Sequence, residues 1–472
     1  MSDAVDPELR QQRGKALRKR ASRKQHDHIG GHDRDPVALL EASSRTRLPR
    51  LLPLRYGRML ASPFAFFRGS AIVQAHDLAG TPYSGLIVPL CGDCHLLNFG
   101  GFATPERNLI FDVNDFDETH PGPWEWDVKR LAASFHIAAR HQGYAEHDCA
   151  DIVAAALDSY REHTKTYARC GELELWYDRI SFERLIQEAE DPDMRAQLAQ
   201  TVEKASGRTH EHLLPKLGSR TGDHWTMHDA PPGLFHIHGP ASLFEPDDDW
   251  RRPGDWQRLI QPMYAAYLDT VSSSHRALLG RFRAQDLAFK VVGVGSVGTR
   301  CLVLLLTDGH DSPLFLQFKE ALPSVLADYV PAGRCPYRHQ GRRVVAGKRL
   351  MQASSDIFLG WTTAFDGRQF YVRQLRDMKV SPEIETYDEA QLHYYAASCG
   401  RVLARGHARA GGLAPEIAGY LGNGDAYTAA VLDYARDYAD RVEQDFEKFR
   451  SACRSGRLQA QTEADLAAEF RV

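Results

Sequence analysis

Long hydrophobic runs are missing from this 472-residue sequence, and none approaches the roughly 20 apolar residues that a membrane-spanning helix needs. The first residues are polar and charged, so they lack the apolar centre of a signal peptide. The eight cysteines are scattered through a long chain, which argues against a disulfide scaffold. These absences predict a protein of the reducing cytoplasm that has no membrane partner.

An excess of basic residues is also missing. The chain has 58 Lys and Arg against 62 Asp and Glu, for a formal net charge of −4. Proteins dedicated to nucleic-acid binding normally carry a clear basic excess, so no nucleic-acid partner is expected. Hydrophobic residues, by contrast, make up 43% of the chain, enough to bury a substantial core at this length.

The residue pattern divides the chain into four parts. Residues 1–35 are polar and basic, which predicts a flexible tail. Residues 36–285 have mostly helical periodicity and form the predicted large lobe. Residues 286–380 contain short β-type runs separated by turns, with one helix, and form a predicted small lobe. Residues 381–472 are helical and are expected to pack back on the large lobe, so the predicted fold class is α+β.

Three local predictions can be compared directly with a structure. Strands over 85–90 and 108–113 are expected to pair as a hairpin with a polar loop at each end. Residues 209–250, rich in His, Pro, Gly and Asp, are predicted to be irregular. Residues 256–282 are predicted to form a helix.

One polar segment, Cys91-Gly-Asp-Cys-His-Leu-Leu-Asn-Phe-Gly100, places an Asp five residues before an Asn. This is the spacing of the kinase catalytic loop, in which the Asp accepts or orients the proton of the acceptor hydroxyl and the Asn contacts magnesium. The spacing alone is weak evidence, because Asp and Asn are common turn formers. Asp93 is therefore a candidate catalytic residue and Asn98 a candidate metal ligand.

The acidic run Asn114-Asp-Phe-Asp-Glu118 follows the second predicted strand and strengthens this interpretation. Mg²⁺ prefers oxygen ligands and usually combines one or two protein groups with phosphate oxygens. Asp115 is the preferred ligand, with Asp112 and Asp117 as competitors. Asp127 stands at a predicted helix start, where its carboxylate can bind backbone N–H groups and brace the metal loop.

A glycine-rich segment, Gly293-Val-Gly-Ser-Val-Gly298, has three possible interpretations. It can be a dinucleotide-binding turn before a helix, a phosphate-covering β-hairpin, or only a tight bend. Strand-forming residues follow at 300–306, which favours the hairpin. Its backbone at Gly293, Gly295, Ser296 and Gly298 would then cover phosphates, and Lys319, at the end of an apolar run, would reach them.

Five segments, at 58–69, 91–100, 114–118, 124–131 and 371–379, resemble a bacterial family catalogued as domain of unknown function 2252. The resemblance extends over about residues 35–450. The family name implies no established activity.

The same residues are more distantly similar to aminoglycoside and choline kinases, which carry His-Gly-Asp-x-His-x-x-Asn, a hairpin, a metal-binding Asp and a helix-opening Asp. Asp93, His95 and Asn98 match the first motif, Asp115 the metal carboxylate and Asp127 the last Asp. In those kinases the glycine-rich hairpin and the lysine precede this loop, whereas here they follow it. The resemblance therefore implies a circularly permuted, kinase-like two-lobe fold.

Two departures from that pattern are visible. Cys91 stands where the kinases have the first His, and the predicted helix at 341–352 contains no Glu to pair with Lys319. Glu320 is adjacent to the lysine but is expected on the opposite face of the strand. Arg68 and Arg373 are interpreted as structural arginines.

The resemblance implies a Mg²⁺- and ATP-dependent phosphotransferase that acts on an unknown hydroxyl acceptor, either a small molecule or a protein. Two alternatives remain open: transfer of AMP with the nucleotide reversed, and a non-catalytic, pseudokinase-like nucleotide-binding protein. The string from Cys91 to His95 also matches a haem attachment motif, but that chemistry belongs outside the cytoplasm. The predicted site residues are Asp93 and His95 for catalysis; Gly293, Gly295, Ser296, Gly298 and Lys319 for ATP; and Asn98, Asp115 and Asp117 for Mg²⁺.

Overall fold

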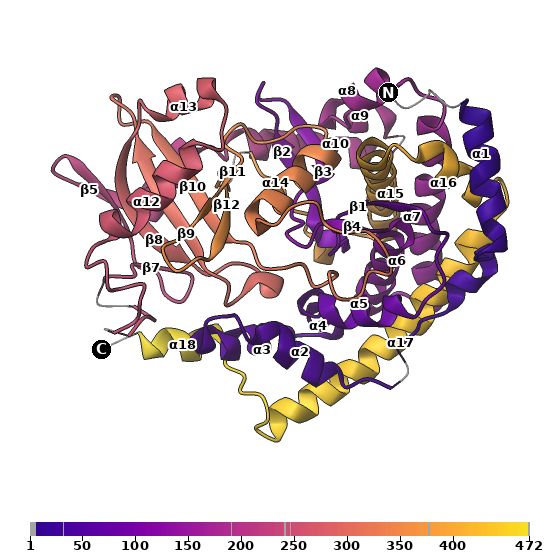
Figure 1. The fold of residues 1–472 in the computed structure, drawn as a ribbon, viewed down its shortest axis with the longest axis horizontal. Helices are drawn as coiled ribbons and strands as arrows, with labels where there is room; N and C mark the ends of the chain where they lie inside the picture. Colours follow the sequence, from indigo (N-terminus) through magenta and orange to yellow (C-terminus); the bar gives the residue numbers. More distant parts are fainter. Residues whose placement is uncertain are drawn as a thin grey trace.

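The computed structural model describes residues 6–31, 33–189, 191–239, 242–245, 247–375 and 378–470. Arg376 and Asp377, in the segment 371–379, lie outside the described residues. The chain folds into a mixed α+β structure with a helical side and an antiparallel sheet side (Figure 1).

The helices of the first part of the chain are α1 (Pro7–Ala16), α2 (Pro36–Ser44), α3 (Leu52–Met59), α4 (Pro63–Gly69), α5 (Ala71–Ala79), α6 (Trp124–His141), α7 (Glu146–Tyr167), α8 (Glu172–Tyr177), α9 (Phe182–Glu188) and α10 (Pro192–Ser206). The later helices are α11 (His210–Leu217), α12 (Trp256–Leu268), α13 (Ser273–Leu279), α14 (Gln340–Met351), α15 (Glu389–Gly411), α16 (Ala414–Leu421), α17 (Ala426–Arg454) and α18 (Glu463–Glu469). None of these helices, within the described residues, is both long enough and apolar enough to span a bilayer.

Four strands belong to the helical side: β1 (Ile87–Leu90), β2 (Phe99–Ala103), β3 (Leu109–Val113) and β4 (His120–Pro123). The later strands are β5 (Gly218–Thr221), β6 (His224–Met227), β7 (Leu234–Phe235), β8 (Arg283–Lys290), β9 (Cys301–Thr307), β10 (Pro313–Glu320), β11 (Gly360–Thr363) and β12 (Gln369–Gln374).

The main sheet has six strands in the order β11-β12-β10-β9-β8-β7, and all neighbours are antiparallel. Every residue of β9 is buried, because both sheet faces are covered. Leu302 and Leu304 pack with residues of α12, whereas Val303 and Leu305 pack on the opposite face, as the two-residue period of a strand requires. Covered faces explain why this strand is a continuous apolar run.

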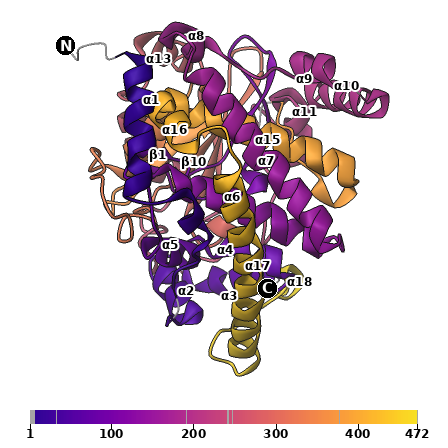
Figure 2. The same cartoon turned by 90° about the vertical axis from the view of Figure 1, so that its right-hand side faces the viewer.

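The helical side is built around α6, α7, α15 and α17, which share one large apolar core (Figure 2). Helices α7 and α15 lie in close contact at Gly400, where an added Cβ would come within 2.1 Å of the Ala156 carbonyl oxygen. A side chain at this position would push the two helices apart, so glycine is needed for their close packing.

The N-terminal segment differs from the flexible tail that the sequence predicted for residues 1–35. Helix α1 packs against α16, and Arg10 pairs with Glu416 at 2.7 Å. Arg18 and Arg23 donate hydrogen bonds to the last carbonyl groups of α16, at Gly419, Tyr420 and Leu421. These carbonyls have no partner within their own helix, and the basic residues satisfy them.

Helices α15, α16 and α17 of the C-terminal segment pack on the helical side, as predicted for residues 381–472, but α18 does not. Helix α18 lies beside α3 (Figure 1), and its Leu466 is buried in the core of the sheet side. The ring of Phe470 lies 5.2 Å from that of Phe235, which belongs to β7. The end of the chain therefore joins the helical side to the sheet side.

The predicted pairing of the first two strands is wrong. Strand β1 pairs with β4, and β3 pairs with β2 instead. The sequence signal for β2 is weak because Gly100 and Gly101 occupy it, and Gly101 exchanges two backbone hydrogen bonds with Val380. The region 209–250 is more regular than predicted, since it contains α11 and the β5–β6 hairpin, and the helix predicted over 256–282 is divided into α12 and α13.

Candidate functional site

Residues from both sides of the molecule line one cavity of about 780 Å³. Three segments are named here: the Asp93 loop (residues 91–98), the acidic loop (114–118) and the glycine turn (293–298). The cavity brings together nine of the ten residues that the sequence singled out: Asp93, His95, Asn98, Asp115, Asp117, Gly293, Gly295, Ser296 and Lys319. Gly298 does not line it.

Helix α6 holds the Asp93 loop through one of its faces. Asp127 accepts hydrogen bonds from the backbone N–H groups of Cys91 and Gly92 at 2.6 and 2.9 Å. One turn later, Arg130 donates from Nε to Asp93 Oδ1 at 2.6 Å. Ser134 Oγ accepts from the loop N–H of residue 96 at 3.0 Å. Asp127 binds backbone N–H groups as expected, but they belong to the Asp93 loop and not to the acidic loop. Arg130 and Ser134 contact the same loop from the same helix face.

A second brace comes from α15. His407 Nε2 lies 3.2 Å from Asp127 Oδ2, and its Nδ1 lies 2.9 Å from the Tyr160 hydroxyl. Both Asp127 and His407 are about 1% exposed. The loop is therefore held by Asp127 and His407 with Cys91 at its start.

Within the loop, the Asn98 amide nitrogen donates to the Asp93 carbonyl oxygen at 2.7 Å. That contact leaves the side-chain oxygen of Asn98 as its remaining acceptor. His95 Nε2 lies 3.8 Å from Asp93 Oδ2. Burial lowers the pKa of His95 to about 3, so its imidazole is neutral at pH 7.

Lys319 of β10 reaches the acidic loop from the sheet side. Its Nζ lies 3.4 Å from Asp115 Oδ2 and forms an ion pair with Asp117. Burial alone would lower the pKa of Lys319, but Asp115 and Asp117 raise it well above its usual value. These two carboxylates are the partners of the lysine that the sequence left unidentified. Glu320 faces away, as expected, toward Arg300 and Arg368.

The three competing carboxylates have different surroundings. Asp112 accepts from Arg405 at 2.7 and 2.8 Å, is about 1% exposed and does not line the cavity. Asp117 accepts from the Tyr371 hydroxyl at 2.6 Å. Asp115 Oδ1 is buried and has no hydrogen-bond partner among the described residues. Asp112 is thus part of a structural ion pair, and Asp115 and Asp117 remain as candidate ligands.

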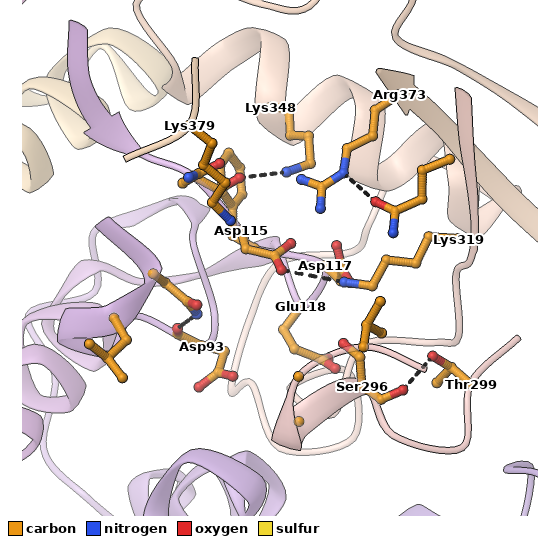
Figure 3. A pocket seen from close by; sticks show the side chains of 18 of the residues that line it. Asp93, Asp115, Asp117, Glu118, Ser296, Thr299, Lys319, Lys348, Arg373 and Lys379 are labelled. Atoms are coloured by element: carbon orange, nitrogen blue, oxygen red, sulfur yellow. Dashed lines mark hydrogen bonds and ion pairs between the residues drawn. The ribbon is translucent and has the colours of Figure 1, made fainter. Parts of the chain in front are cut away.

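Three further cations lie near Asp115 and, with Lys319, form what we call the cation cluster: Lys319, Lys348, Arg373 and Lys379 (Figure 3). Burial alone would raise the pKa of Asp115, but Lys319 and then the other cations of the cluster hold it well below its usual range. Lys348 comes from α14, the helix that lacks a Glu. Arg373 and Arg68, interpreted from the sequence as structural, both line the cavity.

The glycine turn connects β8 to β9 in an antiparallel hairpin, so a strand follows Gly298. A dinucleotide-binding turn would require a helix at that position. At Gly295, an added Cβ would lie 3.4 Å from the Arg68 carbonyl oxygen and 4.0 Å from Asp93 Oδ2. The turn therefore faces the Asp93 loop directly. Gly298 has φ +88° and approaches the Arg47 side chain, so its role is to form the bend.

Carboxylate and amide oxygens, the ligand type that Mg²⁺ prefers, line the cavity. Among the described residues, no group of three or more His, Cys, Asp or Glu is arranged to hold a metal by itself. Mg²⁺ needs only one or two protein groups when phosphate oxygens complete its coordination. The unpartnered Oδ1 of Asp115 and the side-chain oxygen of Asn98 are suitable groups.

The fold and the site define a mixed α+β protein with a charged cavity lined by residues of a helical side and an antiparallel sheet. The chain belongs to the family described as "Uncharacterized protein conserved in bacteria (DUF2252)", which matches residues 47–452. That range contains the Asp93 loop, the acidic loop, the glycine turn and the cation cluster, but neither α1 nor α18. Comparison with curated proteins and with solved structures gives no match.

Proposed function

We propose that this protein is a kinase-like, Mg²⁺·ATP-dependent phosphotransferase that acts on a hydroxyl acceptor. The observation that carries the proposal is the meeting of Lys319 with Asp115 and Asp117 in the cavity that Asp93 and the glycine turn also line. A lysine for phosphates, carboxylates for a metal and an Asp for the acceptor are the parts that phosphoryl-transfer enzymes need.

The order of elements on the sheet side supports a kinase-like, circularly permuted fold. The glycine turn lies between β8 and β9, Lys319 lies on the next strand, β10, and helix α14 follows. Protein kinases have the same sequence of parts, with a Gly-rich hairpin, a lysine on the third strand and then a helix. Here the strands follow the Asp93 loop in sequence, as a permuted arrangement requires.

The roles of the side chains follow from their positions. The backbone of the glycine turn and Lys319 would hold phosphates, and Asp93 would orient the acceptor hydroxyl and take its proton. Arg130 and the backbone contact of Asn98 keep the Asp93 loop in one geometry. Asn98 and Asp115, with Asp117 beside them, would hold Mg²⁺, which would neutralise charge on the phosphates.

Helix α14 has no Glu to pair with Lys319, and this absence favoured a non-catalytic protein. Two observations weaken that alternative. Asp115 and Asp117 provide the countercharge that holds Lys319 in place. Asp127 and His407 hold the Asp93 loop without the absent histidine. The remaining parts therefore support catalysis rather than nucleotide binding alone.

Calorimetry and a turnover assay with Mg²⁺ and ATP test the proposal. We expect Lys319→Met to lose most of its affinity for ATP, because a buried charge-assisted contact is removed. We expect Asp93→Asn to bind ATP like the unaltered protein but to lose turnover. Full turnover in Asp93→Asn, or no ATP binding by the unaltered protein, would contradict the proposal.

A further inference from the structure

The cations and Asp93 lie on different sides of the acidic loop. Figure 3 shows Lys348, Arg373 and Lys379 beyond Asp115, on the side away from Asp93. A donor held in the cavity must place the phosphorus that is attacked near Asp93, because Asp93 orients the acceptor hydroxyl. The leaving part of the donor then lies toward the cation cluster.

Lys348 indicates what kind of group this end of the cavity holds. Its Nζ donates to the Asn114 carbonyl oxygen at 3.2 Å and lies 4.4 Å from the centre of the Phe116 ring. No described carboxylate forms an ion pair with it, although the side chain is only about 3% exposed. Asp115 and Asp117, which favour its charged form, also face Lys319 and Arg373, so two carboxylates serve three cations, and an anionic ligand would balance the remaining charge.

Two members of the cation cluster, Lys319 and Lys348, lie at the inner end of the cavity, whereas Arg373 and Lys379 are half-buried. Lys319 and Lys348 are about 2% and 3% exposed, whereas Gly293 and Gly295 of the glycine turn are exposed. A purine base requires mainly apolar walls, but here the lining includes Lys319, Lys348 and the pair Arg373 and Gln317, which are hydrogen-bonded to each other at 2.9 Å. The inner end therefore suits the phosphate terminus of a nucleotide and not its base.

We infer that ATP binds with its β- and γ-phosphates on the cation cluster and its α-phosphate toward Asp93, so that the group transferred is AMP. The inference rests on the proposed function and specifies which phosphorus atom reacts. The oxygen of the acceptor hydroxyl forms a bond to the α-phosphorus, and the bond from that phosphorus to the bridging oxygen of the β-phosphate breaks. Pyrophosphate leaves with the electron pair, and the hydroxyl proton passes to the Asp93 carboxylate.

The cation cluster has a definite role in this step. Charge develops on the pyrophosphate as the bond breaks, and fixed cations in a buried site stabilise that charge more strongly than water does. Lys348 and Lys379 would contribute to this stabilisation in addition to Lys319. If the γ-phosphate were transferred, it would lie near Asp93, and the nucleoside rather than a phosphate terminus would lie at the end of the cavity that holds these cations.

The first experiment follows the label from ATP. The full-length protein is incubated with Mg²⁺ and ATP labelled at either the α- or the γ-phosphorus, and the small products and the protein are separated. We expect the α-label in AMP or on an acceptor, including the protein itself, and the γ-label in pyrophosphate. Release of ADP, with the γ-label transferred or in orthophosphate, would overturn the inference and leave the proposed function standing. Absence of any product would contradict both.

A binding experiment tests Lys348 without requiring turnover. Calorimetry with inorganic pyrophosphate is expected to show binding that Lys348→Met weakens by roughly tenfold or more, because a charged hydrogen bond is lost. Lys348→Arg should restore part of the affinity. Lys216→Met, on the exposed surface of α11, is the matched control and should leave binding unchanged. Equal pyrophosphate affinity in Lys348→Met and the control would overturn the inference.

Discussion

The Asp93 loop and the glycine turn face each other across the cavity, but they are held in different ways. The Asp93 loop is fixed by buried side chains of α6 and α15, with Asp127 and His407 about 1% exposed. Gly293 and Gly295 of the glycine turn are exposed. Arg47 and Arg58 donate hydrogen bonds to the carbonyl oxygens of residues 297 and 292, at and just before the ends of the turn. The comparison teaches that the Asp93 loop is preorganised by buried contacts, whereas the glycine turn is held mainly at its ends.

Removal of Asp127 is expected to have the largest effect. Asp127→Ala leaves two backbone N–H groups and His407 without their partner in a buried place, which costs about 3–5 kcal/mol of the free energy of unfolding. Urea unfolding measures this loss. Asp151→Ala, an exposed residue of α7, is the control and should change stability by about 0.5 kcal/mol or less. Equal stability of the two variants would show that the loop is not braced in this way.

Glycine substitutions compare the two regions directly. Gly400→Ala introduces a methyl group 2.1 Å from a carbonyl oxygen of α7, and overpacking of this kind costs about 1–3 kcal/mol. Gly295→Ala meets no atom closer than 3.4 Å, so its stability should stay within about 0.5 kcal/mol. Its ATP affinity should fall, because the methyl group lies above Asp93. If Gly295→Ala unfolds more easily than Gly400→Ala, the comparison is wrong.

The pH dependence of stability reports the burial of His95. An unfolded histidine titrates near about 6.5, whereas the pKa of His95 is lowered by burial to about 3. Between these values the unfolded chain takes up a proton that the folded chain does not, so stability falls as the pH decreases. In His95→Gln, the free energy of unfolding should therefore decrease by up to about 1.4 kcal/mol less for each pH unit than in the unaltered protein. Unfolding at several pH values measures it, with the exposed His224→Gln as a control that keeps the original slope.

The smallest effect is expected at the surface contact that ties α18 to α3. Arg58 pairs with Glu463 at 2.8 Å, but the Glu463 side chain is 61% exposed. Solvent-exposed pairs contribute about 1 kcal/mol or less, so Glu463→Gln should hardly change stability. Leu466→Ala, which removes a buried contact of the same helix, should cost about 2–5 kcal/mol. If urea unfolding showed a larger loss of stability in Glu463→Gln than in Leu466→Ala, charge and not apolar burial would hold α18 in place.

Part of the site was predictable because local spacing carries the information. The Asp93–Asn98 interval, the acidic run after a strand and a lysine at the end of an apolar run are visible in the sequence. Lys348 was not identified, since a lysine in a helix is usually exposed and only the packing of α14 turns it inward. Arg130 was missed for a similar reason, although its position three residues after Asp127 was a usable signal.

The same distinction applies to the fold. Strands β9 and β10 could be recognised because they are apolar runs bounded by turns, whereas β2 was missed because its glycines conceal the strand, and β7 was missed within a region predicted to be irregular. The basic N-terminal segment gave no sign that its arginines satisfy the end of α16, which lies some four hundred residues later.

The sequence by itself determined the identity and spacing of the groups to which we assign chemical roles in the proposal, because their spacing is set within short segments of the chain. Only the tertiary structure decided that Lys319 meets Asp115 and Asp117 and that three further cations gather near Asp115. The physical reason is that burial and pairing of charges depend on contacts between distant segments, and no local pattern records those contacts.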